Sequence, residues 1–157
     1  MVNQSLKNKK IIISAGASGI GLATVKVCLD RGATVFVSDI NDKYINKLKK
    51  NSKINKKLFV FNCDASDEYQ VVNLFEKIRK KTPKIDCLIN NVGIAGPTGT
   101  MDNLSSSEWE NTLRVNVFSH FYFNKLAIPM LKKNKGGSII NISSGAGIMG
   151  FPLRSPY

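Results

Sequence analysis

Residues 14–21, with the sequence SAGASGIG, have the composition of a phosphate-binding turn. They lie between a short aliphatic run, 11–13, and an amphipathic stretch that begins at Gly19. Glycines at such a place let the backbone turn sharply and approach a pyrophosphate, whose charge is attracted by the free N–H groups of a helix start. The alternative is a tight turn that only packs a helix against a strand. The position of the glycines between strand and helix favours the phosphate site.

A single acid follows the next aliphatic run. Asp39 comes about 18 residues after Gly21, where a carboxylate could accept both hydroxyls of an adenosine ribose and would repel a 2′-phosphate. Ser18 stands in the turn where an NADP site often carries a Lys or Arg. Both features predict NAD as the cofactor, with NADP less favoured. The alternative roles of Asp39 are a surface loop acid and a helix N-cap, because a helical pattern follows it.

The composition is that of a globular protein, with 43% hydrophobic and 22% charged residues among 157. No apolar run approaches the ~20 residues of a membrane helix, and the N-terminal sequence has no signal-peptide core. Cys28, Cys63 and Cys87 form no CxxC pair and the chain has one histidine, so neither a disulfide framework nor a metal site is expected. We therefore expect a cytoplasmic protein without a membrane partner or a metal.

The formal net charge of +12 raises the hypothesis of nucleic-acid binding. Only four of the 23 basic residues are arginines, however, and aromatic residues are not interleaved with them. We expect a solvated basic surface and no nucleic-acid partner. The alternative, a nucleic-acid-binding domain, would bind DNA or RNA with strong salt dependence.

Short aliphatic runs alternate with longer amphipathic stretches along the whole chain. Uninterrupted aliphatic strands separated by helices indicate a parallel sheet that is covered on both faces. Right-handed crossovers then give a doubly wound sheet, so we predict a single Rossmann-type α/β domain of three layers, α/β/α, over residues 1–157. The expected strands are 10–14, 34–38, 58–61, 85–90 and 137–142, and the expected helices are 19–31, 42–51, 68–81 and 106–133.

With these motifs in this order, the whole chain resembles the classical short-chain dehydrogenase/reductase family. The family's turn, T-G-x-x-x-G-I-G, is matched at 19–21, while Ser14 replaces its Thr and Ala15 its first Gly. Residues 63–65 resemble the adenine-contacting D-V pair and would otherwise be a helix cap; 90–93 resemble the N-N-A-G motif and would otherwise be a polar turn. The cofactor-binding residues that the resemblance implies are Ser14, Gly16, Ser18, Gly19, Ile20, Gly21, Asp39, Asp64, Ala65, Asn91 and Gly93.

Three further residues match the family's catalytic positions. Asn116 corresponds to the active-site asparagine, and Tyr157 to the tyrosine of Y-x-x-x-K. Ser144 corresponds to the catalytic serine because its distance from Tyr157 is the family's serine-to-tyrosine spacing; Ser143 is the alternative. His120, on the same predicted helix as Asn116, is interpreted as a packing or surface residue.

The resemblance implies an NAD-dependent oxidoreductase that transfers hydride between nicotinamide and a secondary alcohol or ketone. The tyrosine would exchange a proton with the substrate oxygen, the serine would hydrogen-bond that oxygen, and the asparagine would hold a water of the proton relay. The family's lysine and its later C-terminal strands lie beyond the last residue, so we expect this chain alone to be inactive or nearly so. We expect the full-length form to be a homo-oligomer. The alternative is a non-catalytic NAD-binding module.

Overall fold

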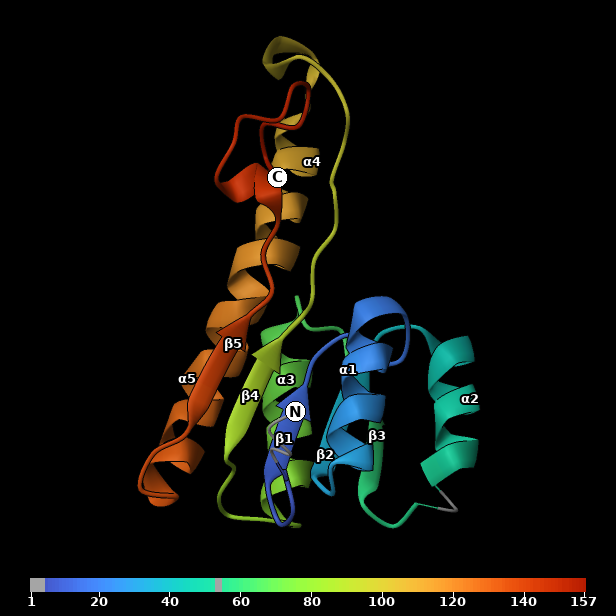
Figure 1. Cartoon of the computed structure of the whole chain (residues 1–157). Coiled ribbons are helices and arrows are strands. Elements are labelled where there is room, and N and C mark those ends of the chain that lie inside the picture. The colour runs from blue at the N-terminus through green and yellow to red at the C-terminus, as the bar shows by residue number, and fades with distance from the viewer. Residues whose placement is uncertain (1–4, 53–54) are drawn as a thin grey trace.

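Five parallel strands form one twisted sheet in the computed structural model, which describes residues 5–52 and 55–157 (Figure 1). The strand order, β3-β2-β1-β4-β5, runs outward in both directions from β1, as in a doubly wound fold. The predicted fold class is therefore confirmed. The strands are β1 (Lys10–Ile13), β2 (Thr34–Asp39), β3 (Leu58–Asn62), β4 (Cys87–Asn90) and β5 (Ser138–Asn141).

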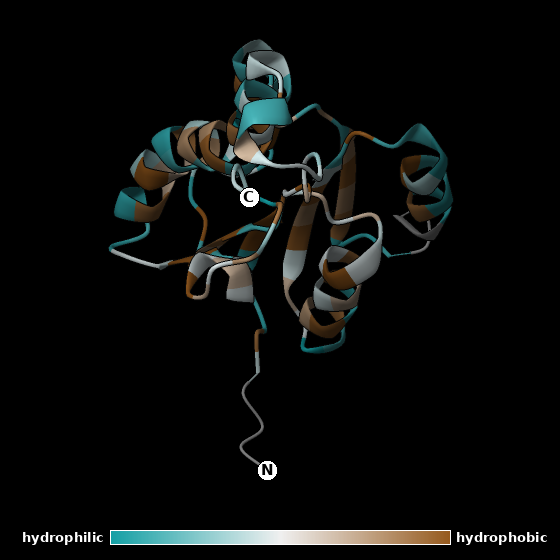
Figure 2. Cartoon of the chain, turned by 90° about the horizontal axis from the view of Figure 1, so that it is seen from above, coloured by the Kyte–Doolittle hydropathy of each residue, from teal (hydrophilic) through white to brown (hydrophobic). Residues whose placement is uncertain are grey.

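Helices cover both faces of this sheet, so the molecule has three layers (Figure 2). Two of them pack into one hydrophobic cluster and two into the other. The first face carries α1 (Gly19–Asp30) and α2 (Asp42–Ser52), and the second carries α3 (Glu68–Arg79) and α5 (Ser119–Lys133), with α4 (Ser106–Leu113) preceding α5.

The strand sequences supply both clusters because alternate side chains of a strand point to opposite faces. Ile12 packs with Phe36 and Leu88 on the α3 and α5 side, while Ile13 packs with Val37 on the α1 and α2 side. Ile12 and Ile13 are both completely buried. A strand that is apolar on both faces is thus the expected consequence of helices on both sides.

The observed bounds differ from the predicted ones by one or two residues, and the long predicted helix has one irregularity. Between α4 and α5, the backbone of Arg114–Phe118 forms a π-helical turn within an otherwise continuous helical segment. The predicted strand at 85–90 begins instead at Cys87, and just before it the Asp86 carboxylate accepts a hydrogen bond from the Lys10 N–H at 2.9 Å.

Above the carboxyl edge of the sheet, the segment after β4 and the C-terminal segment rise together beside α4 (Figure 1). They are joined where the Gly99 N–H donates to the Leu153 carbonyl and the Arg154 guanidinium donates to the Gly96 carbonyl, both at 3.0 Å. Within the described ranges, no helix is both long and apolar enough to cross a membrane.

Candidate functional site

The glycine turn lies between β1 and α1, where it leaves polar groups open to a ligand. Ser18 is the N-cap residue of α1, yet its hydroxyl makes no capping bond. Gly19 has a left-handed φ of +52°, and a Cβ placed on it would have no heavy atom within 4 Å. The first N–H groups of a helix have no partner within the helix. An open turn with unused donors fits an anion such as a pyrophosphate.

The turn is braced from the neighbouring strand end. The Asn91 N–H donates to the Ser14 hydroxyl at 3.0 Å, and the Asn91 amide donates to the Ala15 carbonyl at 2.9 Å. A Cβ on Gly21 would overlap both that carbonyl and the Asn91 amide, so only glycine fits there. Asn91 and Ser14 therefore position the turn together, because they are hydrogen-bonded to each other and Asn91 also holds the Ala15 carbonyl.

Asp39 ends β2 beside the same turn and is 7% exposed. Its carboxylate accepts hydrogen bonds from the Ala17 N–H at 2.9 Å and the Asn41 N–H at 3.0 Å. The surface-acid alternative is therefore wrong. The cap of α2 is made instead by the Asn41 side chain, which accepts from the Tyr44 N–H. A carboxylate has about four lone-pair positions, so two remain for a ligand.

Asp64 and Ala65 follow β3, the next strand along the same edge. Asp64 accepts hydrogen bonds from the Ser66 N–H and hydroxyl at 2.8 and 2.7 Å, and thereby orders the turn before α3. The N-cap of α3 is Asp67, whose side chain accepts from two N–H groups of the first turn. The helix-cap alternative for Asp64 is therefore wrong. Ala65 is buried beneath this turn.

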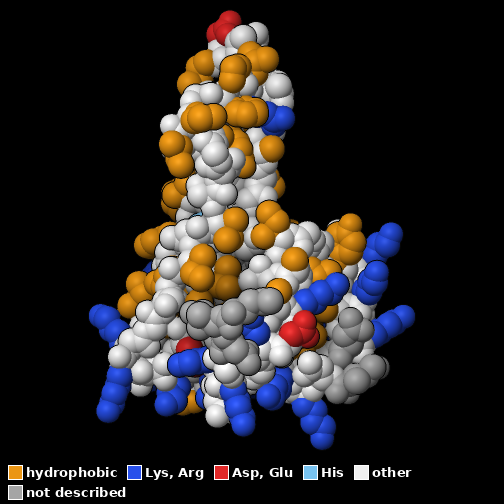
Figure 3. Space-filling view, in the orientation of Figure 1, with side chains coloured by type: hydrophobic (Ala, Val, Ile, Leu, Met, Phe, Trp, Pro, Cys, Tyr) orange, Lys and Arg blue, Asp and Glu red, His pale blue; other side chains and the backbone are white. Residues whose placement is uncertain are grey.

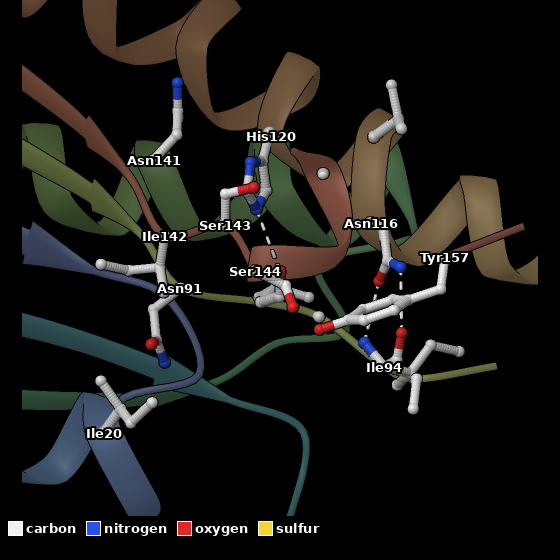
Figure 4. Close-up of a pocket in the computed structure, with 15 residues that line it drawn as sticks. Ile20, Asn91, Ile94, Asn116, His120, Asn141, Ile142, Ser143, Ser144 and Tyr157 are labelled. Carbon is white, nitrogen blue, oxygen red and sulfur yellow. Dashed lines mark hydrogen bonds between the residues drawn. The ribbon is translucent and has the colours of Figure 1, made fainter. Parts of the chain in front are cut away.

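A pocket of about 550 Å³ opens at the carboxyl ends of β4 and β5 (Figure 4). It is lined by the first turn of α1, the segments that follow β4 and β5, the helical segment around the π turn, and the last residue. Parallel sheets of this kind bind ligands at this edge. Six of the predicted site residues line it, namely Ile20, Asn91, Gly93, Asn116, Ser144 and Tyr157; the other eight, Ser14, Gly16, Ser18, Gly19, Gly21, Asp39, Asp64 and Ala65, do not.

Asn116 lies in the π turn and connects the helix to the opposite wall of the pocket. Its amide accepts a hydrogen bond from the Ile94 N–H at 2.8 Å and donates one to the Ile94 carbonyl at 2.9 Å. Single π turns inside α-helices occur frequently at functional sites. The sequence predicts the residue but not the turn, since neither glycine nor proline marks it.

Ser144 and Tyr157 approach the pocket from the segment after β5. The Ser144 Oγ accepts a hydrogen bond from the Ala146 N–H at 3.3 Å, which leaves its own proton free to be donated. Figure 4 shows the Tyr157 ring reaching over the pocket with its hydroxyl toward Ser144. Ser143, the alternative serine, also lines the pocket, so position in the pocket does not decide between Ser143 and Ser144 as the catalytic serine.

His120, interpreted from the sequence as a packing or surface residue, also lines this pocket. It is half-buried, and its Nε2 lies 3.0 Å from the Val92 carbonyl. The available signal was its spacing, because residues four apart on a helix share a face and His120 is four residues after Asn116.

The cysteines lie away from this pocket. Burial, the largest cause, together with neighbouring acids raises the pKa of Cys63 to about 12; burial and the nearby Cys28 thiol raise the pKa of Cys87 to about 11. Both thiols thus stay protonated near neutral pH. Within 5–52 and 55–157, no group of three His, Cys, Asp or Glu side chains is placed to hold a metal ion.

Comparison with known proteins gives a consistent result. The family model described as short chain dehydrogenase matches residues 9–157. The chain is 33% identical to an uncharacterized oxidoreductase of Thermotoga maritima, over 98% of this chain and 60% of that protein. It is 31% identical to the 3-oxoacyl-[acyl-carrier-protein] reductase FabG of the same organism, over 97% and 62%. With a 3beta-hydroxysteroid dehydrogenase of Mediterraneibacter gnavus the identity is 32%, over 96% and 55%.

The crystal structure of gox2181 shares the fold, with a TM-score of 0.87 at 21% identity over 95% of this chain and 58% of that one. The chain thus spans about 60% of the length of the relatives it matches. The glycine turn, Asn91 and the strand-end pocket lie along the chain in the order of the family's motifs, and the family model covers nearly all of the chain. The chain therefore belongs to the classical short-chain dehydrogenase/reductase family.

Proposed function

We propose that this chain is the cofactor-binding and catalytic part of an NAD-dependent oxidoreductase that transfers hydride between nicotinamide and a secondary alcohol or ketone. The observation that carries the proposal is the pocket at the carboxyl ends of β4 and β5. It brings together Asn116 of the π turn with Ser144 and Tyr157 of the segment after β5, next to a glycine turn with open donors. The family supports oxidoreductase chemistry in general.

The described residues divide into two groups along the sheet edge. In this proposal, the turn at Ser18 and Gly19 holds the pyrophosphate, and Asp39 and Asp64 face the adenosine half from β2 and β3. The nicotinamide half then extends past Gly93 into the 550 Å³ pocket. When bound, the cofactor supplies or accepts the hydride, which no protein side chain does.

The protein's own part is to hold the substrate oxygen and move a proton. Ser144 donates its hydroxyl proton in a hydrogen bond to that oxygen, since the bond it accepts from the Ala146 N–H leaves this proton unused. Tyr157 exchanges a proton with the same oxygen. Asn116 fixes the Ile94 wall through two hydrogen bonds, and we assign it the relay water that the family resemblance implies.

Two substitutions at one position test pyrophosphate binding. Ser18→Asp places a carboxylate at the helix N-cap, where it stabilises the helix but repels a phosphate. We expect an unchanged or higher unfolding temperature and at least tenfold weaker NADH binding, measured by fluorescence. The matched control, Ser18→Asn, supplies a cap without charge and should bind NADH within about twofold of the wild type. Equal binding by both variants would contradict the proposed site.

The choice of NAD over NADP is a separate proposal that rests on Asp39. Its carboxylate has acceptor positions for ribose hydroxyls and repels a 2′-phosphate. We expect the native chain to bind NADH more tightly than NADPH. Asp39→Asn should lower the ratio of the NADPH and NADH dissociation constants by about tenfold, or roughly 1.4 kcal/mol. Asparagine keeps one acceptor, which can serve the Ala17 N–H, but loses the oxygen that accepts from the Asn41 N–H, so the unfolding temperature of the variant is measured beside its affinities. Equal affinity for both cofactors in the native chain would defeat the proposal.

The second candidate is a cofactor-binding module without turnover. In its favour, no Lys or Arg of the described chain lines the pocket beside Tyr157. An unassisted tyrosine, with a pKa near ~10 in free solution, is a poor base at neutral pH. We expect little or no NADH-linked turnover by the 157 residues on a panel of small alcohols and ketones. Robust turnover would exclude the module and show that this chain is catalytically sufficient.

We also propose a reducing, cytoplasmic location and a full-length homo-oligomer that uses no nucleic acid. Three free cysteines, two of them fully buried, suit a reducing compartment. An affinity for DNA or RNA that falls steeply with salt would overturn the proposal that the protein has no nucleic-acid partner.

A further inference from the structure

His120 is held in the pocket by a hydrogen bond whose direction fixes its tautomer. A carbonyl oxygen can only accept, so Nε2, at 3.0 Å from the Val92 carbonyl, carries a proton. In the neutral ring Nδ1 is then an unprotonated acceptor. No described residue hydrogen-bonds to Nδ1, and it is not among the buried unpaired atoms, so it is open to solvent.

Protonation changes the charge of this ring without moving it. Both the neutral Nε2–H form and the imidazolium donate to Val92, so the bond that positions the ring persists through the titration. Only Nδ1 changes, from an acceptor to a donor, and the ring gains one positive charge.

That charge would have no counterpart in the pocket. The lining consists of apolar residues, glycines, amides and hydroxyls, with Tyr157 as the other titratable group and no Asp, Glu, Lys or Arg. The charged side chains on the surrounding elements lie outside it. Lys125 and Glu68 form an ion pair at 2.9 Å, Arg79 donates to the Leu126 carbonyl, Arg114 is exposed, and Arg154 donates to the carbonyls of Ala95 and Gly96. The charged residues of α4 and of the end of α5 do not line the pocket either, namely Glu108, Glu110, Lys132 and Lys133.

We propose that His120 makes this pocket discriminate between the two redox states of the cofactor, favouring NADH over NAD⁺ when its imidazole is protonated. The inference rests on the proposed function, because it needs the nicotinamide in the pocket with Ser144 and Tyr157. The oxidised nicotinamide ring carries a positive charge and the reduced ring is neutral. A protonated His120 therefore repels the first and leaves the second unaffected.

The size of the pocket makes the effect measurable. Two like charges in a partly solvated protein site repel by more than thermal energy at separations up to roughly 8 Å. Because the pocket is open to water, we expect roughly a three- to tenfold loss of NAD⁺ affinity on protonation. By linkage, NAD⁺ must disfavour protonation of His120 by the same factor.

The chain allows an unambiguous reading of this residue, because His120 is its only histidine. In ¹⁵N-histidine-labelled protein, NMR should show a single imidazole whose neutral form is the Nε2–H tautomer. Saturating NAD⁺ should move its titration midpoint to lower pH by about half a unit to one unit, and NADH should not move it. Equal midpoints with the two cofactors would overturn the proposal.

Binding measured against pH gives the second test. Over the pH range in which the NMR signal of His120 titrates, the ratio of the dissociation constants of NAD⁺ and NADH should rise three- to tenfold toward the acidic end in the wild type. In His120→Gln, which keeps an N–H donor for Val92 and cannot titrate, the ratio should be flat. A flat ratio in the wild type, or the same slope in the variant, would refute the role of His120 and leave the proposed function standing. No binding of either cofactor would defeat the proposed function itself, and this inference with it.

Discussion

Ala15 is the residue at which this chain departs most clearly from the family's turn. Its φ of +48° lies in the left-handed region, which costs an alanine about 1–2 kcal/mol. Ala15 stands where the family has glycine, and its left-handed φ is the conformation that glycine adopts without strain. The turn keeps its path because Asn91 holds the Ala15 carbonyl, at the expense of a strained backbone.

Ala15→Gly should therefore stabilise the protein. Glycine removes the left-handed strain but adds backbone entropy to the unfolded chain, so the net gain in the free energy of unfolding is about 0.5–1 kcal/mol. Urea denaturation measures it. Ala17→Gly is the control, since Ala17 is buried and has no positive φ, and it should destabilise by about 1 kcal/mol. A loss of stability in Ala15→Gly would show that the turn does not carry this strain.

The individual site residues were predictable where chemistry restricts the residue type. Gly21 has no room for a side chain, and Asn91 must donate a hydrogen bond to the Ala15 carbonyl to brace the turn. Each position therefore restricts the residue type, and the residue is recognisable in the sequence. His120 was not predictable in this way, because its role depends on the Val92 carbonyl, which lies 28 residues earlier in the chain.

At the scale of elements, periodicity located the five strands and the longer helices, because the strands carry consecutive apolar residues and the helices have an apolar face. It did not locate the short 3-10 helices at Met101–Asn103 and Gly145–Gly147. It could not locate the π turn at Arg114–Phe118, since one extra residue per turn leaves the surrounding pattern intact. It also could not show that Asp86 precedes β4 rather than belonging to it. That boundary is set by long-range hydrogen bonds.

Asp86 joins three elements at the amino ends of the strands. Its carboxylate accepts from the Lys10 N–H at 2.9 Å, from the Lys9 ammonium at 3.0 Å and from the Asn134 amide at 3.1 Å. Burial acts to raise the pKa of Asp86, but these hydrogen bonds and the charge of Lys9 outweigh it and hold the pKa below its usual value. The contribution to stability is thus fully present above the pKa of the unfolded chain and is lost as the pH falls through the lower folded value.

Asp86→Asn should lower the free energy of unfolding by roughly 1–3 kcal/mol at neutral pH, as expected for hydrogen bonds to a charged group. Thermal unfolding measured from about pH 7 to about pH 3 should show the difference from the wild type shrinking toward the acidic end. Asp30→Asn, at the exposed end of α1, is the control and should change stability little. A difference that is constant over this pH range would contradict the role given to the Asp86 charge.

At the scale of the whole molecule, charge and apolar surface are separated. In the view of Figure 3, Lys and Arg side chains surround the lower part, while hydrophobic side chains cover the column that rises above the carboxyl edge of the sheet. Exposed large side chains of that column include Phe118, Ile148 and Phe151, which are 48%, 91% and 62% exposed. The pocket opens at this apolar end, and none of the described Lys or Arg side chains lines it.

The last strand adds a second apolar surface to this end of the sheet. β5 pairs with β4 on one side, no other described strand pairs with its outer edge, and all four of its residues are exposed. Ile140 is 45% exposed there. An unpaired apolar edge is a template for association with another chain, and lysine on such an edge prevents it. We therefore expect this chain to self-associate as its concentration rises, and Ile140→Lys to suppress that association.

Analytical ultracentrifugation over a concentration series measures the effect, with the unfolding temperature as a check that the fold persists. Ile140→Lys should remain monomeric at concentrations where the wild type associates, at a cost in stability within about 0.5 kcal/mol, because the side chain is largely in solvent. Val27→Lys separates edge pairing from a general effect of charge, since Val27 is 48% exposed on α1 and lies on no strand. If Val27→Lys suppressed association equally, the added charge and not the edge of β5 would be the cause.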